Sequence, residues 1–119
     1  MKIKTGKTIR ITTDNKVEVL EIPWTLEGHE EAIGADMCEV VHTISDYLPL
    51  VMLVDECGLL LDKPVNKAAS IMYGAERHGA CIVGDVILVE QEGPEIEPLT
   101  QLDFVKCKLL NVFPFLEEI

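Results

Sequence analysis

The chain has 119 residues, of which 48% are hydrophobic and 26% are charged. A chain of this length suits a single domain, because it can bury about two thirds of the surface that its unfolded form exposes. Its formal net charge of −11 repels nucleic acid, which argues against direct DNA or RNA binding. No apolar stretch has the length of about 20 residues that crosses a bilayer, so we expect a cytoplasmic protein without a membrane partner.

The charge is unevenly distributed along the chain. Residues 1–16 are basic overall, whereas residues 17–62 contain no lysine or arginine and eleven acids. An acidic field of this kind steers a protein toward basic partners. The eleven acids are Glu18, Glu21, Glu27, Glu30, Glu31, Asp36, Glu39, Asp46, Asp55, Glu56 and Asp62.

The first predicted element is a β-hairpin within residues 1–22. Residues 8–13 and 17–22 alternate apolar and polar side chains around Asp14-Asn15-Lys16, which is typical of two antiparallel strands joined by a turn.

A short helix follows the hairpin. Thr25 has the side chain of a helix N-cap, and Gly34 has the conformational freedom to end the helix. We expect its exposed face to carry three carboxylates, those of Glu27, Glu30 and Glu31.

Two further strands are predicted over residues 37–43 and 50–55. The second is apolar at nearly every position, which indicates burial on both faces. We expect Asp55-Glu56-Cys57-Gly58 to form a turn in which Gly58 has a positive φ angle, and residues 59–61 to return as a short strand.

The middle of the chain contains a capped helix. Asn66 is placed as its N-cap, residues 67–73 make two helical turns, and Gly74 ends it. Gly84 interrupts the apolar residues 81–89, a pattern that favours one bulged strand.

The last part of the chain is an acidic loop, a helix and a tail. Residues 91–98 contain prolines and acids, and Thr100 with Asp103 forms a capping box for the last helix. We expect Phe113 and Phe115 to pack back on the sheet. The whole pattern predicts an α+β fold: a mostly antiparallel, twisted sheet of about five or six strands with two or three short flanking helices.

From residue 26 to residue 110 the order of elements resembles a family of small, phage- and plasmid-borne bacterial proteins catalogued as a domain of unknown function. The resemblance implies a family-like core between the hairpin of residues 1–22 and a tail of residues 111–119. The setting of the family in mobile elements implies a host-facing or regulatory role, and the family offers no catalytic residues to carry over. The motifs that carry it are Ile33-Gly34, Cys38-Glu39-Val40-Val41, Asp55-Glu56-Cys57-Gly58, Pro64-Val65-Asn66 with Ala68, and Ile82-Val83-Gly84-Asp85-Val86.

The acidic stretch has two interpretations. One is a solvated surface that opposes aggregation. The other is an interface for a basic protein partner, as in an antagonist of host defence or a nucleic-acid mimic, formed by a non-enzymatic monomer or homodimer. The residues that would form it are Glu27, Glu30, Glu31, Asp36, Asp55 and Glu56.

A zinc site is an alternative that we disfavour. Two thiols and two imidazoles are a zinc ligand set, and they occur here as Cys38, His42, His78 and Cys81. On one strand, however, Cys38 and His42 would lie about 13 Å apart, too far to share one ion. We therefore expect no metal and no cofactor. Because the four cysteines lie in apolar or strand-like contexts and no export signal accompanies them, we expect reduced, mostly buried thiols.

The alternative function is a small-molecule-binding or hydrolytic domain with a pocket near Asp85 and His78. Asp85 could act as a base there, or it could accept hydrogen bonds from nearby backbone amides. Trp24 and Tyr73 could anchor an interface, although core packing is the commoner role of such side chains.

Overall fold

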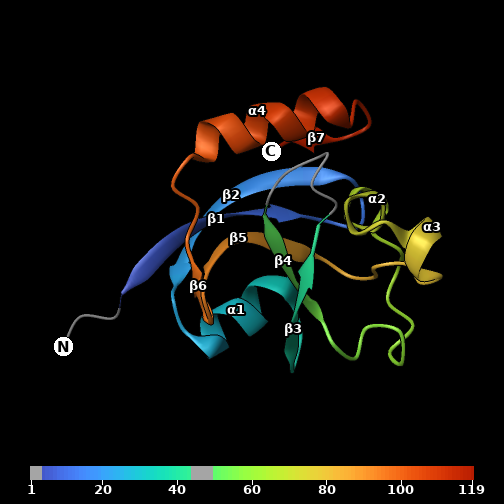
Figure 1. The fold of residues 1–119 in the computed structure, drawn as a ribbon, viewed down its shortest axis with the longest axis horizontal. Coiled ribbons are helices and arrows are strands. Elements are labelled where there is room, and N and C mark those ends of the chain that lie inside the picture. The colour runs from blue at the N-terminus through green and yellow to red at the C-terminus, as the bar shows by residue number, and fades with distance from the viewer. Residues whose placement is uncertain (1–3, 44–49) are drawn as a thin grey trace.

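The computed structural model describes residues 4–43 and 50–119, and these form a sheet with helices on both faces (Figure 1). The elements in chain order are β1 (Thr5–Ile11), β2 (Lys16–Pro23), α1 (Leu26–Ile33), β3 (Cys38–His42), β4 (Val51–Asp55), α2 (Lys67–Tyr73), α3 (Ala75–His78), β5 (Val86–Glu92), β6 (Glu95–Glu97), α4 (Leu102–Val112) and β7 (Glu117–Glu118).

The sheet has the order β3-β4-β5-β1-β2-β7, and β6 pairs with β5 beside this path. All its pairs are antiparallel except β2 with β7, which is parallel. The α+β class and the mostly antiparallel sheet are therefore confirmed. Among the described residues the sheet has seven strands and so is larger than predicted, because β6 and β7 are too short to leave an apolar pattern. The same residues form four helices instead of two or three, since the four-residue α3 leaves no helical pattern either.

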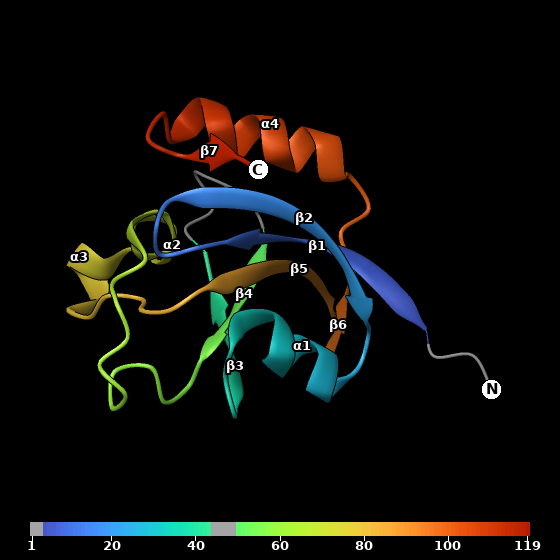
Figure 2. The same cartoon turned by 180° about the vertical axis from the view of Figure 1, so that it is seen from behind.

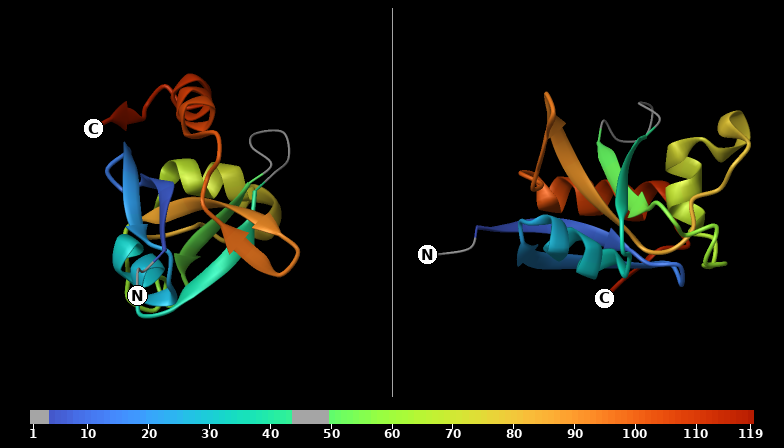
Figure 3. Two further views of the ribbon diagram at one scale, coloured as in Figure 1. Left: turned by 90° about the vertical axis from the view of Figure 1, so that its left-hand side faces the viewer. Right: turned by 90° about the horizontal axis from the view of Figure 1, so that it is seen from below.

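The described residues form three layers, which Figures 2 and 3 show from other sides. Helix α1 covers one face of the sheet, where Ala32 and Ile33 belong to the same buried cluster as Leu53 and Ile87. Helices α2 and α4 cover the opposite face and share a larger cluster with β1, β4 and β5. Every residue of β4 is buried, so the prediction of a strand covered on both faces is confirmed.

The predicted hairpin and the helix after it are also confirmed. Asn15 has a φ angle of 65° in the turn between β1 and β2. The Thr25 side chain accepts a hydrogen bond from the Gly28 amide at 3.0 Å, and Gly34 ends α1 with a φ angle of 67°. These caps fix where α1 begins and ends, and so fix which of its residues face the sheet.

Asn66 connects three parts of the fold, and no part of it is exposed to solvent. Its side-chain oxygen accepts from the Ala69 amide at 3.1 Å, which caps α2 as predicted. Its amide nitrogen donates to the carbonyls of Ile11 at 2.9 Å and Gly84 at 3.0 Å. One side chain therefore joins β1, the start of α2 and the segment before β5.

The turn after β4 differs from the prediction. Residues 59–61 form no strand but continue the turn, in which Asp62, rather than Gly58, has a positive φ angle of 55°. Gly58 is needed for space, because a Cβ there would lie 2.7 Å from Cγ2 of Val83. A run of three leucines suits a strand by its composition, but this one has no neighbouring strand to pair with among the described residues.

Two other predictions need correction. Residues 81–89 are not one bulged strand: Gly84 has a φ angle of 80°, and only Val83 before it pairs, in an isolated bridge with Val65. The segment 91–98 is not only a loop, since β6 forms a hairpin with the end of β5. Thr100 caps no helix, because its amide and hydroxyl both donate to Glu90, at 2.9 and 2.8 Å.

The tail packs back as predicted. Phe113 is buried in the larger cluster, and Phe115 lies partly buried against it with Nζ of Lys67 4.2 Å from its ring centre. The predicted link between β3 and β4, which includes Asp46, lies outside the described residues. Within residues 4–43 and 50–119, no helix combines the length and the apolar character that crossing a bilayer requires.

The substitution N66A should lower the free energy of unfolding by about 3 kcal/mol. It removes a helix cap worth about 1 kcal/mol and leaves two buried carbonyls without their donor. Urea denaturation followed by circular dichroism measures the change. The control is N111A on the exposed surface of α4, which should cost less than about 0.5 kcal/mol. Equal stability of the two variants would contradict the role assigned to Asn66.

Candidate functional site

The outward face of α1 carries three carboxylates, as the sequence predicts. Glu27 and Glu31 are exposed and Glu30 is partly buried, because Gly28, His29, Ala32 and Ile33 occupy the inward positions. None of the three carboxylates forms an ion pair with another described residue. This face therefore carries negative charge that its described surroundings do not neutralise.

Two cations lie close to α1, and both bind its C-terminal end. Arg10 donates to the carbonyl of Ala32 at 3.0 Å, and Nζ of Lys63 donates to the carbonyl of Gly34 at 2.7 Å. Positive charge is favourable there because the last carbonyls of a helix point outward. Each cation also pairs with its own carboxylate, Arg10 with Glu18 and Lys63 with Asp55. Neither is left to pair with the glutamates of α1.

Asp55 does not belong to the exposed acidic surface that the sequence suggests. Its side chain is 1% exposed and pairs with Lys63, and its Oδ1 accepts from the Cys57 amide at 2.9 Å. A buried carboxylate needs such partners to offset its lost hydration. Asp55 instead holds the end of β4, the turn after it and, through Lys63, the end of α1.

Asp36 and Glu56 extend the charge of α1 across the end of β3. Both side chains are exposed, and the Glu56 amide donates to the carbonyl of Met37 at 3.0 Å, which places the two acids at the same end of the sheet. Burial and the nearby charges of Glu30 and Asp55 raise the pKa of Cys38 to about 11, so Glu30 lies near the first residue of β3. We call Glu27, Glu30, Glu31, Asp36 and Glu56 the acidic surface.

Exposed apolar side chains lie beside the acidic surface. Leu59, Leu60 and Leu61 are 65%, 87% and 58% exposed, and we call them the leucine turn. The turn is held by backbone hydrogen bonds, including Leu61 N–H to Cys57 at 3.1 Å and Lys63 N–H to Gly58 at 3.1 Å. In Figures 1 and 2 this segment follows β4 and lies beside the end of the sheet where β3 begins. Exposed apolar clusters of this kind mark interaction sites.

The leucine turn was missed by sequence reasoning, since an apolar triplet after a strand resembles another strand. The signal that could have identified it is the pair of polar, turn-forming segments on either side, Asp55-Glu56-Cys57-Gly58 and Asp62-Lys63-Pro64. Such flanking residues favour a surface turn over a buried strand.

The alternative zinc site does not form among the described residues, where no three side chains of histidine, cysteine, aspartate or glutamate gather to hold a metal ion. Cys38 and His42 lie at opposite ends of β3, as the strand spacing predicts. His78 ends α3, and its ring stacks on Tyr73 with 4.2 Å between centroids.

Asp85, predicted to lie near a pocket, and Trp24, predicted as an interface anchor, are both engaged in structural contacts. Asp85 accepts a hydrogen bond from the Thr13 amide at 3.0 Å, which fixes the turn of the first hairpin against β5. Trp24 donates to the carbonyl of Ile96 at 3.2 Å. Its ring lies nearly perpendicular to that of His29, with 4.5 Å between the ring centroids. Burial lowers the pKa of His29, so its imidazole is neutral at neutral pH and packs as an apolar ring.

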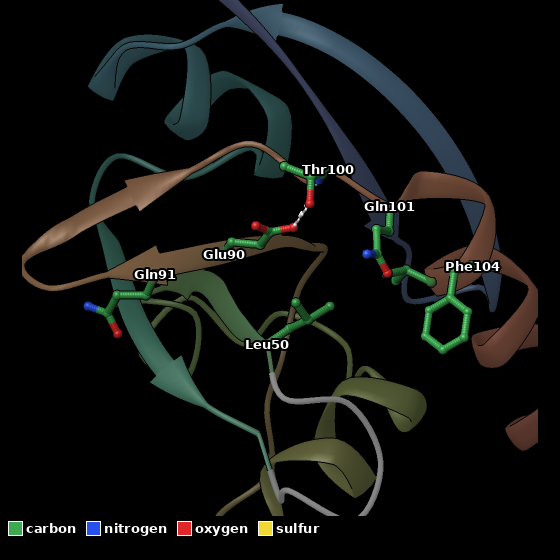
Figure 4. A pocket seen from close by; sticks show the side chains of 7 residues that line it. Leu50, Glu90, Gln91, Thr100, Gln101 and Phe104 are labelled. Carbon is green, nitrogen blue, oxygen red and sulfur yellow. Dashed lines mark hydrogen bonds between the residues drawn. The ribbon is translucent and has the colours of Figure 1, made fainter.

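An open cavity of about 360 Å³ lies between α4 and β5. Figure 4 shows Glu90 and Thr100 joined by a hydrogen bond, with Leu50 and Phe104 on other sides of the opening. Glu90 is the only titratable side chain of its lining and already accepts two hydrogen bonds from Thr100. A second open cavity is lined by residues of α4 alone, including Cys107 and Asn111. Neither Asp85 nor His78 lines either of these two cavities.

Comparison with protein-family models finds a family that matches most of the chain. Residues 5–110 match the model described as domain of unknown function DUF3846, so the chain belongs to that family. The match includes β1 and β2, which the resemblance drawn from the sequence left outside the family core. Comparisons with curated proteins and with solved structures find no match.

Alkylation of Cys38 should be slow at about pH 8 and should rise roughly tenfold per pH unit up to about pH 9.5, because a thiol with a pKa near 11 remains mostly protonated throughout this range. Iodoacetamide labelling followed by peptide mass spectrometry measures it. Cys81 and Cys107 serve as internal references, because both are exposed and the prediction of mostly buried thiols is wrong for them. E30Q should accelerate the labelling of Cys38, since it removes a nearby negative charge, whereas E27Q should not. A plateau in rate below about pH 9 would show that the Cys38 pKa is much lower.

Proposed function

We propose that this member of the DUF3846 family is a non-enzymatic binding protein that docks a basic protein partner on its acidic surface and leucine turn. The observation that carries the proposal is the unneutralised outward face of α1. Glu27, Glu30 and Glu31 project from one short helix, and the two nearby cations, Arg10 and Lys63, are bound to other groups. A carboxylate surface of this kind attracts and orients a positively charged partner.

Affinity needs more than charge, and the leucine turn supplies the apolar contact. Exposed ion pairs contribute little to binding, whereas apolar anchors that enter a pocket carry most of it. Leu60 is 87% exposed and sits on a turn that backbone hydrogen bonds hold in place, so little conformational entropy is lost when it docks. The partner that fits has an apolar pocket with basic residues around it.

The resemblance to phage- and plasmid-borne proteins supports a further part of the proposal, that the partner is a host or phage protein which itself binds nucleic acid. Such a protein has a basic groove, and carboxylates on one face can occupy it as phosphates do. In this setting the protein acts as an antagonist or a regulator.

Reversing the charge of α1 tests the proposal. We expect the triple variant E27K/E30K/E31K to retain at least tenfold less basic protein than the unchanged chain in affinity capture from a host extract, because attraction becomes repulsion. The matched control is E76K/E92K/E95K, which has the same net charge but changes exposed acids elsewhere. A double-stranded DNA fragment should compete with the unchanged chain for the captured protein. Equal capture by the two triple variants would refute a role for the acidic surface.

The leucine turn gives an independent prediction. L60D should leave the free energy of unfolding within about 0.5 kcal/mol of its original value, because Leu60 is almost fully exposed. The same change should weaken partner binding at least tenfold if Leu60 enters an apolar pocket. The control I119D adds a charge at another exposed apolar residue, far along the chain. Urea denaturation measures the free energy of unfolding of both variants, and titration calorimetry with the captured partner measures their affinity. Unchanged affinity of L60D would remove the leucine turn from the interface.

A further inference from the structure

Strand β3 has an edge that no described strand occupies. It is the last strand on its side of the sheet and pairs only with β4. Glu39, Val40 and His42 are exposed, and Figure 3 shows β3 on the outside of the sheet. An open edge presents unpaired backbone donors and acceptors that a further strand can use.

The register of β3 with β4 identifies these backbone groups. The Glu56 amide donates to the carbonyl of Met37 at 3.0 Å, and the Thr43 amide donates to Leu50 at 3.4 Å. Because the hydrogen-bonded residues of an antiparallel pair alternate, Glu39 and Val41 also bond toward β4. The N–H and C=O groups at the intervening positions therefore point away from the sheet, at Cys38, Val40 and His42.

We propose that this edge accepts an extended, basic segment of the partner by β-strand addition. This inference rests on the proposed function and specifies how the partner binds. The acidic surface adjoins the edge at the N-terminal end of β3, where Glu30 lies near Cys38 and Asp36 precedes the strand. Glu39 adds an exposed carboxylate within the strand itself. Basic side chains on an added strand would meet these carboxylates on both faces of the sheet.

Charge also distinguishes this occupant from a second copy of the chain. A second copy pairing through its own β3 would bring its Glu39 close to this Glu39 in either strand direction, and in a parallel pair its Glu30 and Asp36 as well, while each chain has a net charge of −11. Like charges at a sheet edge oppose pairing. A basic segment brings the opposite charge to the same backbone groups. Its apolar, β-branched residues would lie beside Val40 and Val41, and its basic residues toward Cys38.

Synthetic peptides test the edge directly. One fluorescent probe contains Thr-Val-Val-Lys-Arg-Lys and another contains Lys-Arg-Lys-Val-Val-Thr, so that antiparallel and parallel addition are both sampled, and Glu-Asp-Glu-Val-Val-Thr is the acidic control. We expect one basic probe to raise the fluorescence anisotropy and the acidic peptide to leave it unchanged. N-methylation of the valines in the bound probe should abolish binding, because it removes the backbone donors of the added strand.

The protein variant that isolates the edge is V40P. Proline removes the outward N–H of Val40 and leaves the bonds of Glu39 and Val41 to β4 intact, which is the position at which an edge strand tolerates proline. V40P should bind the basic probe at least tenfold more weakly, whereas V40T keeps the N–H and should bind it normally. If V40P does not fold, the N-methylated probe tests the same bonds from the other side.

Amide hydrogen exchange gives the residue pattern that only strand addition produces. In the free protein, the amides of Cys38, Val40 and His42 should exchange at least tenfold faster than those of Glu39 and Val41, and the bound probe should slow them. Equal exchange at all five amides, unchanged affinity of V40P, or a homodimer that V40P dissociates would overturn the inference. If E27K/E30K/E31K lowers the capture of the basic partner and V40P does not, the inference of strand addition at the β3 edge is overturned, whereas the proposed function is supported.

Discussion

The buried side chain of Asn66 is the contact on which the arrangement of the fold depends. It satisfies two backbone carbonyls from distant parts of the chain, those of Ile11 and Gly84, while capping α2. In a buried place each of these groups would otherwise be costly, because no water replaces the lost hydrogen bond. The three hydrogen bonds of Asn66 therefore stabilise one relative arrangement of β1, α2 and β5 over arrangements in which these bonds are not formed.

A second buried polar contact has the same effect near the candidate site. Asp55 and Lys63 are the one ion pair whose carboxylate is almost wholly buried among the described residues. Lys63 also binds the last turn of α1 through Gly34, so the pair joins the helix that carries the acidic surface to the turn that carries the leucines. The negative charge of Asp55 is therefore neutralised inside the fold and does not reach the surface. The exposed glutamates retain theirs because the nearby cations are already bound.

The exposed glutamates of α1 can be predicted from the apolar and polar pattern of the sequence, whereas the burial of Asp55 and the leucine turn cannot. The helix of residues 26–33 has a regular period and two clear caps, so its outward glutamates followed from local pattern alone. Local pattern places Asp55 on the same surface, although Asp55 is buried, because it does not determine the shape of the turn beyond which its partner Lys63 lies. Local pattern predicts a strand for the three leucines, because it does not show whether a neighbouring strand is present to pair with them.

Local sequence patterns are sufficient to predict the first hairpin with its turn, the capped helices α1 and α2, and β4 as an apolar strand covered on both faces. The sequence also determines the strong negative charge. Three features depend on the folded arrangement of the described residues: which acids stay exposed, which edge of the sheet is open, and the short strands β6 and β7. The physical reason is that capping and periodicity depend on neighbours a few residues apart, whereas burial, ion pairing and strand pairing depend on residues that meet only after folding.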